Sequence, residues 1–143
     1  MMLLIFQLIS CSFMTGLIWT IQILHYPAFS LIPTYEFKKF HTAHSRNITF
    51  IVLPAMLLEL MTAVLLILKF PELRIFWMNM ILVLLIWLST FFLSVPCHNS
   101  LTASQDQEVI KRLVLTNWVR TILWSARLGL LTFFTIRFGE LVF

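Results

Sequence analysis

The fold is decided by the stretch ITFIVLPAMLLELMTAVLLILKFPELRIFWMNMILVLLIWLSTFFLSV, residues 48–95. It contains two long apolar runs, about 48–70 and 75–95, which are joined by a short turn around Pro71. A helix needs about 20 apolar residues to cross the hydrocarbon core of a bilayer, and both runs reach that length. Because the turn is short, we expect the two runs to form antiparallel neighbouring helices.

Two further apolar runs complete the pattern. The first run of the chain covers about 3–29 and the last covers about 113–137, while Pro96 is expected to end the third. The N-terminal segment has no basic residue and its apolar run is too long for a secretory signal peptide, so we expect it to be a retained span. The sequence therefore predicts an all-α fold, an integral membrane up-down four-helix bundle that forms one domain over residues 1–143.

The composition agrees with a membrane protein whose main partner is the lipid bilayer. Of the 143 residues, 60% are hydrophobic and 11% are charged, whereas a soluble domain has about 25% charged residues. The net charge of +4 is scattered, and no Lys/Arg run suits a phosphate backbone, so nucleic acid is not an expected partner. Cys11 and Cys97 should lie near opposite membrane faces, which excludes a disulfide between them.

The alternating direction of the helices gathers the histidines. His25 ends the first span, His41 and His44 precede the second, and His98 follows the third, so all four are expected at one membrane face. Basic residues near that face outnumber those near the other, and the positive-inside rule therefore predicts a cytoplasmic histidine end. They are Lys38, Lys39, Arg46, Lys111 and Arg112, against Lys69, Arg74 and Arg137 on the opposite side.

One face of the fourth span is polar. At 100° per residue, Asn117, Arg120, Trp124 and Arg127 fall within roughly 80° of arc. Arginine at membrane depth nearly always faces the bundle interior and has a partner there. Glu59 is the one carboxylate inside the spans and lies at the same depth as Arg127, so the sequence predicts a buried Glu59–Arg127 ion pair.

The polar groups nearer the histidine end predict a pocket with aromatic walls. We expect its lining to be Trp19, Gln22 and His25 from the first span and Asn117, Arg120 and Trp124 from the fourth. Such a pocket, open at the membrane interface, is typical of a site for a lipophilic small molecule.

The histidines also allow a metal site. His41 and His44 are three residues apart and share one face of a helix, and together with His25 and His98 they could bind one Zn, Cu or Fe ion. Glu59 is not expected to join them, because a continuous helix would place it about 27 Å from His41.

Three short motifs lie around the predicted pocket. His25-Tyr26-Pro27 ends the first span, and the stretch 96–101, Pro-Cys-His-Asn-Ser-Leu, follows the third. The fourth span carries Trp118, Arg120 and Arg127. In these motifs the chain resembles the anthrone oxygenase-like family of small four-span membrane proteins, whose exit motif is Pro-x-Asn-x-x-Leu and whose last span has a W-x-x-x-H-x-x-R-like pattern. The chain departs from it by one extra residue between Pro and Asn, and by Ile122 in place of the family's histidine.

The resemblance implies oxygenation of an electron-rich polycyclic phenol or anthrone without a metal or flavin. A base would remove an acidic C–H proton, and the carbanion would react with O₂. His25 or His98 would be that base, and Arg120 and Asn117 would stabilise the enolate oxygen. Trp19, Gln22 and Trp124 would bind the substrate.

The sequence therefore leaves three hypotheses for the function open. The leading hypothesis is a membrane-embedded, oxygenase-like oxidoreductase without a cofactor. The second is a membrane protein that binds a metal ion through the four histidines. The third is a non-catalytic bundle that serves as a subunit of a larger complex, and a homo-oligomer is compatible with each of them.

Overall fold

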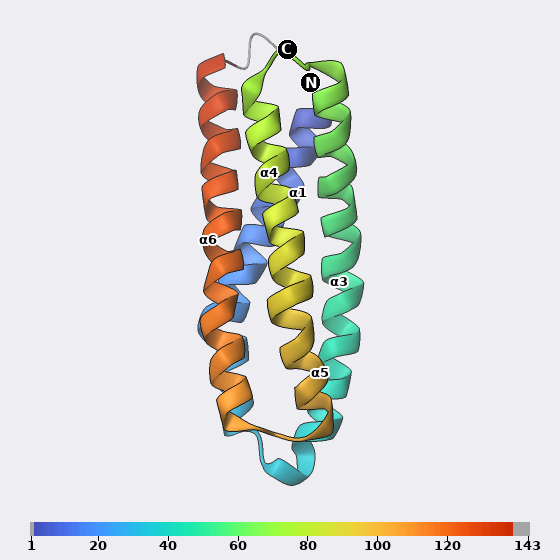
Figure 1. Ribbon diagram of the computed structural model, residues 1–143, viewed down its shortest axis with the longest axis vertical. Coiled ribbons are helices and arrows are strands. Elements are labelled where there is room, and N and C mark those ends of the chain that lie inside the picture. The colour runs from blue at the N-terminus through green and yellow to red at the C-terminus, as the bar shows by residue number, and fades with distance from the viewer. Residues whose placement is uncertain (1, 139–143) are drawn as a thin grey trace.

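The computed structural model describes residues 2–138 and forms a bundle of four long helical segments (Figure 1). Each segment is long and apolar enough to cross a membrane, which suggests a multi-pass membrane protein. The first segment consists of α1 (Met2–Thr20), η1 (Ile21–His25), α2 (Tyr26–Ala28) and η2 (Phe29–Leu31), and the second of α3 (Thr34–Lys69). The third consists of α4 (Arg74–Ser89), η3 (Thr90–Ser94) and α5 (Val95–Ala103), and the fourth of α6 (Gln107–Phe138).

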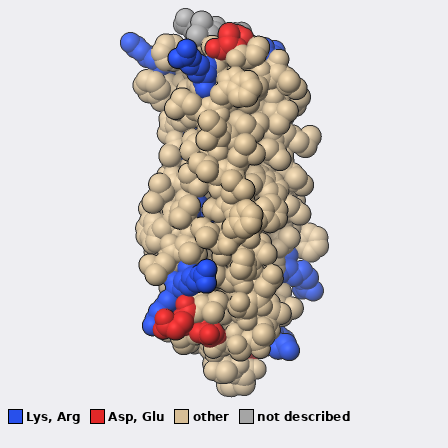
Figure 2. Space-filling model, viewed as in Figure 1, with Lys and Arg blue, Asp and Glu red and all other residues tan. Residues whose placement is uncertain are grey.

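Successive segments run in opposite directions, as predicted for an up-down bundle. The turn through residues 70–73 lies at one end of the molecule, and the connections through 32–33 and 104–106 lie at the other (Figure 1). α1 packs against α3 and α6, and α4 packs against the same two helices. Charged side chains gather towards the two ends, and a broad apolar band separates them (Figure 2).

The helices are longer than the predicted spans. α3 begins at Thr34 rather than near residue 48, and α6 begins at Gln107 rather than near residue 113. The expectation that the third helix stops at Pro96 was wrong, because it continues to Ala103. A hydropathy pattern marks the part of a helix that is apolar, whereas the polar turns beyond it stay helical because their backbone hydrogen bonds continue.

Wide turns precede two of the prolines that lie within helical segments, whereas α3 passes Pro54 without one. η1 and η3 are π-helical, and each ends two residues before a proline, Pro27 and Pro96. Proline has no N–H to donate, and its ring collides with the carbonyl four residues earlier in a regular helix. A π turn changes that hydrogen-bond register locally, and such turns are frequent at functional sites. Tyr26 comes directly after η1, and His98 lies about one helical turn after η3.

Gln105 ties the two connections at this end together. Its Nε2 donates to the carbonyl oxygens of Phe29, at 3.1 Å, and Ile32, at 2.8 Å. The Thr34 hydroxyl donates to Gln105 Oε1 at 2.9 Å. These bonds hold the end of the first segment, the start of α3 and the connection before α6 in one place.

Candidate functional site

The four histidine rings meet at one end of the bundle, as the sequence predicted. His25 Nε2 lies 2.7 Å from His44 Nδ1, and His41 Nε2 lies 3.1 Å from His98 Nδ1. The ring centroids of His44 and His98 are 5.8 Å apart, so the two pairs adjoin each other. We call these four residues the histidine cluster. Its members come from η1, α3 and α5, which are distant in sequence.

A chain of hydrogen bonds leads from α6 into the histidine cluster. Arg120 Nη2 donates to the Tyr26 hydroxyl at 3.2 Å, and that hydroxyl lies 3.0 Å from His98 Nε2. A guanidinium can only donate, so the Tyr26 oxygen accepts from Arg120 and its own proton is free to point at His98 Nε2. One tautomer that satisfies both contacts of His98 has the proton on Nδ1, donated to His41 Nε2, and leaves Nε2 as the acceptor for Tyr26.

Asn117 and Gln22 hold Arg120 in position. Asn117 Oδ1 accepts from Arg120 Nη2, and Asn117 Nδ2 donates to Gln22 Oε1 at 2.7 Å. Gln22 Nε2 is fixed in turn by the carbonyl of Val114 at 3.2 Å. Both amide side chains are buried, and neither lines the cavity beside Arg120. They therefore act on Arg120 rather than on a bound molecule.

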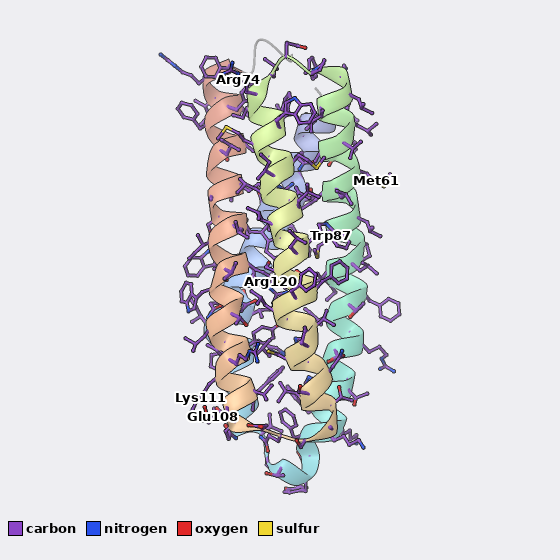
Figure 3. The ribbon with its side chains drawn as sticks, viewed as in Figure 1. Met61, Arg74, Trp87, Glu108, Lys111 and Arg120 are labelled. Atoms are coloured by element: carbon purple, nitrogen blue, oxygen red, sulfur yellow. The ribbon has the colours of Figure 1, made fainter. Side chains whose placement is uncertain are left out.

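A cavity of about 360 Å³ opens beside this chain of hydrogen bonds. Tyr26, His98 and Arg120 form its polar end, and Trp124 and Trp87 contribute aromatic walls. Figure 3 labels Arg120 on α6 and Trp87 on α4, both near the middle of the bundle. The cavity lies where the two apolar clusters of the core meet, and its remaining walls are mostly aliphatic. Its volume is within the range of pockets that bind small molecules.

The predicted Glu59–Arg127 ion pair is confirmed. Arg127 Nη1 lies 2.7 Å from Glu59 Oε1, and both side chains are buried. Trp124 Nε1 donates to the other carboxylate oxygen at 3.2 Å, and Arg127 Nε donates to Asn79 Oδ1 at 2.8 Å. Trp124 thus connects the ion pair to the cavity. Asn79 was missed by the sequence analysis, although it is an isolated amide in an apolar run.

Four residues expected in the pocket lie outside its lining: the amides Gln22 and Asn117, which hold Arg120, and also Trp19 and His25. Trp19 is 39% exposed, and its Nε1 donates to Ser125 Oγ at 3.0 Å on the outer surface between α1 and α6. Its ring packs edge-on against Trp118, so the indole covers the helix contact instead of a ligand. His25 faces His44 in the histidine cluster and does not line the cavity. A helical-wheel argument cannot separate these positions, because η1 changes the angular register after Thr20.

The predicted metal site finds no support in residues 2–138. No three His, Cys, Asp or Glu side chains of this part of the chain are placed so that they could hold a metal ion together. Instead, four ring nitrogens of the histidine cluster face one another in two direct contacts. Cys11 and Cys97 are buried and free, in agreement with the expectation that no disulfide joins them.

The sequence analysis also missed polar groups in the cavity wall. Ser45 and Ser94 line the cavity, and their buried hydroxyls have no hydrogen-bond partner in the described residues. Arg120 Nε is likewise buried without a partner there. Small hydroxyl residues in apolar runs give no signal of their own, but Ser94 directly precedes the Val95-Pro96 step at the end of the π turn.

Comparisons of the chain with family models, with curated proteins and with solved structures found no match. The function is therefore argued from the geometry of the site. That geometry offers a mostly apolar cavity, a buried guanidinium in its wall, and a tyrosine–histidine pair in contact beside it.

Proposed function

We propose that this protein is a membrane-embedded, oxygenase-like oxidoreductase that acts on a lipophilic polycyclic phenol or anthrone. The observation that carries the proposal is the Arg120–Tyr26–His98 chain at the polar end of a mostly apolar cavity. A small number of convergent polar groups in an apolar pocket orients a ligand, so that one end of the ligand lies next to the polar side chains. The Tyr26–His98 pair supplies a proton acceptor, and Arg120 supplies a positive charge next to it.

The proposal places the four helical segments across a bilayer. The broad apolar band between the two charged ends of the molecule supports this placement (Figure 2). The histidine end then lies in the cytoplasm, on the basis of its larger number of Lys and Arg residues. In this position the cavity lies inside the hydrocarbon layer, where an apolar substrate is concentrated.

The reaction begins with proton transfer. Tyr26 passes its hydroxyl proton to His98 Nε2 and takes the acidic C–H proton of the substrate, so that His98 becomes an imidazolium and the substrate an enolate. Arg120 stabilises the enolate oxygen, and Asn117 and Gln22 keep the guanidinium in place. The base and the cation are thus assigned to different side chains that share one hydrogen-bonded chain.

Molecular oxygen is the oxidant and enters as a second substrate. The enolate carbon forms a C–O bond with O₂, and the resulting peroxide takes back the proton from His98 through Tyr26. Loss of water from this hydroperoxide breaks the O–O bond and the remaining C–H bond and leaves a carbonyl. For anthrone the balance is anthrone plus O₂ gives anthraquinone plus water, a four-electron oxidation of carbon matched by the reduction of one O₂.

The test uses anthrone as the probe and the purified full chain in detergent. We expect protein-dependent O₂ uptake with one anthraquinone formed per O₂ consumed, after subtraction of the autoxidation seen without protein. Because a positioned general base contributes about 10²–10⁴-fold, His98→Gln should reduce the rate by at least 10²-fold. Trp19→Phe, on the outer surface, is the matched control and should keep the wild-type rate. Equal rates for His98→Gln and the wild type, or no protein-dependent uptake, would overturn the proposal.

A further inference from the structure

The cavity contains a positive charge that no carboxylate of the described chain neutralises. Arg120 is only 6% exposed, and its side-chain partners are the Tyr26 hydroxyl and the Asn117 carbonyl oxygen, both neutral. Within residues 2–138 the ion pairs are Glu59–Arg127 and Glu108–Lys111, and neither includes Arg120. A buried guanidinium without a counter-ion favours a ligand that brings a negative charge.

Three buried polar atoms belong to residues of the cavity wall. Arg120 Nε is buried without a partner, and so are the hydroxyls of Ser94 and Ser45 within the described part of the chain. All three residues line the cavity. Buried polar groups in folded proteins are normally hydrogen-bonded, so the wall around Arg120 has unused hydrogen-bonding capacity.

The mouth of the cavity is on the side of the bundle. Thr49 and Leu53 from α3, and Phe91 and Val95 from η3 and α5, line the cavity and are also exposed on the surface. Leu53 is 44% exposed and Phe91 is 54% exposed. These residues belong to the apolar stretches of their helices, not to the polar connections at the histidine end. In a membrane, this opening faces acyl chains.

From these observations we infer that the cavity takes its ligand from the bilayer as a lipophilic weak acid, which loses its proton in the cavity so that its anionic oxygen pairs with Arg120. The apolar body of this ligand extends towards the opening between α3 and η3. The inference deepens the proposed function and rests on it, because it specifies the charge state and the source of the molecule in that same cavity. A lipophilic weak acid dissolved in the membrane meets the side opening directly.

The pairing of an anionic oxygen group with Arg120 is tested with two probes that have the same tricyclic body. 9-Anthracenecarboxylate carries an anionic oxygen group and 9-anthracenemethanol a neutral one, and neither can undergo the proposed oxidation. Binding to the full chain in phosphatidylcholine nanodiscs is followed by energy transfer from tryptophan. We expect the carboxylate to bind at least about tenfold more tightly, because a hydrogen bond to a charged group is the stronger kind. Arg120→Met should remove this preference, and Arg120→Lys should keep most of it.

The side opening is tested by the association rate of the carboxylate probe. Thr49→Phe puts a large side chain into the mouth, and we expect it to slow association severalfold. Ile51→Phe is the matched control, because Ile51 is exposed on the same helix and does not line the cavity. Equal affinity for the two probes, or a preference that survives Arg120→Met, would overturn the assigned head group. Equal association rates for the two phenylalanine variants would overturn the side opening. Tight carboxylate binding without anthrone oxidation would refute the proposed function alone.

Discussion

Removal of one member of the Glu59–Arg127 pair should cost far more stability than removal of both. The 2.7 Å contact is fully buried, so Glu59→Leu leaves a guanidinium charge among apolar helices with Asn79 as its remaining hydrogen-bond acceptor. Leaving such a charge unpaired costs about 3–5 kcal/mol. Total stabilities of about 5–15 kcal/mol are typical, so the single variant loses a large share of the free energy of unfolding.

The double variant Glu59→Leu/Arg127→Met removes both charges and fills the space with apolar atoms. It still loses one hydrogen bond each for Trp124 and Asn79, about 1 kcal/mol apiece. We therefore expect a loss of about 2 kcal/mol, smaller than that of either single variant, where simple addition of the two would give about 6–10 kcal/mol.

The measurement is unfolding of the detergent-solubilised protein by increasing fractions of SDS, followed by tryptophan fluorescence. Glu108→Gln is the control, because the Glu108–Lys111 pair has the same 2.7 Å length but side chains that are 80% and 68% exposed. It should give no measurable change, since exposed ion pairs contribute little. If the double variant lost the sum of the two single losses, the two charges would not interact, and the argument from burial would be refuted.

Three further outcomes are expected from the site and the connections. Tyr26→Phe should bind the anthracene probes about as well as the wild type but oxidise anthrone at least about 10²-fold more slowly, because the group that takes the C–H proton is lost; unchanged turnover in a steady-state assay would contradict this. Gln105→Ala should lower the free energy of unfolding by about 1–3 kcal/mol in the SDS assay, because three hydrogen bonds across the connections are lost, and an unchanged midpoint would show that they are replaced by water. Trp124→Phe should reduce energy transfer to the bound probe, because Trp124 lines the cavity. Trp19→Phe should leave the affinity for the probe unchanged, and a fall in that affinity would show that Trp19 contributes to the binding site.

The sequence predicted the architecture well because hydropathy and helix direction are simple physical constraints. Four apolar runs and one tight turn were enough to place distant histidines at one end, and depth along the helix was enough to pair Glu59 with Arg127. The helix limits were not predicted as well, since hydropathy does not report where polar backbone stays helical. The same reasoning could not predict which way the rings point. His25 and Trp19 share the polar side of an ideal helix with Gln22, but the π turn at η1 separates them.

The two π turns explain why the site lies where it does. A regular helix through Pro27 or Pro96 would be bent or broken, and a loop would leave backbone N–H and C=O groups unpaired at membrane depth. A π turn before each proline keeps the backbone bonded and also rotates the residues after it, so that Tyr26 and His98 reach each other at 3.0 Å. The wide turns before Pro27 and Pro96 thus accompany the Tyr26–His98 pair at the cavity wall, whereas α3 passes Pro54 without a wide turn. If Pro96→Ala restored a regular helix, we would expect the four-helix fold to persist and His98 to lose its contact with Tyr26. Histidine ¹⁵N NMR spectra of the folded variant would show this loss as a changed Nε2 signal.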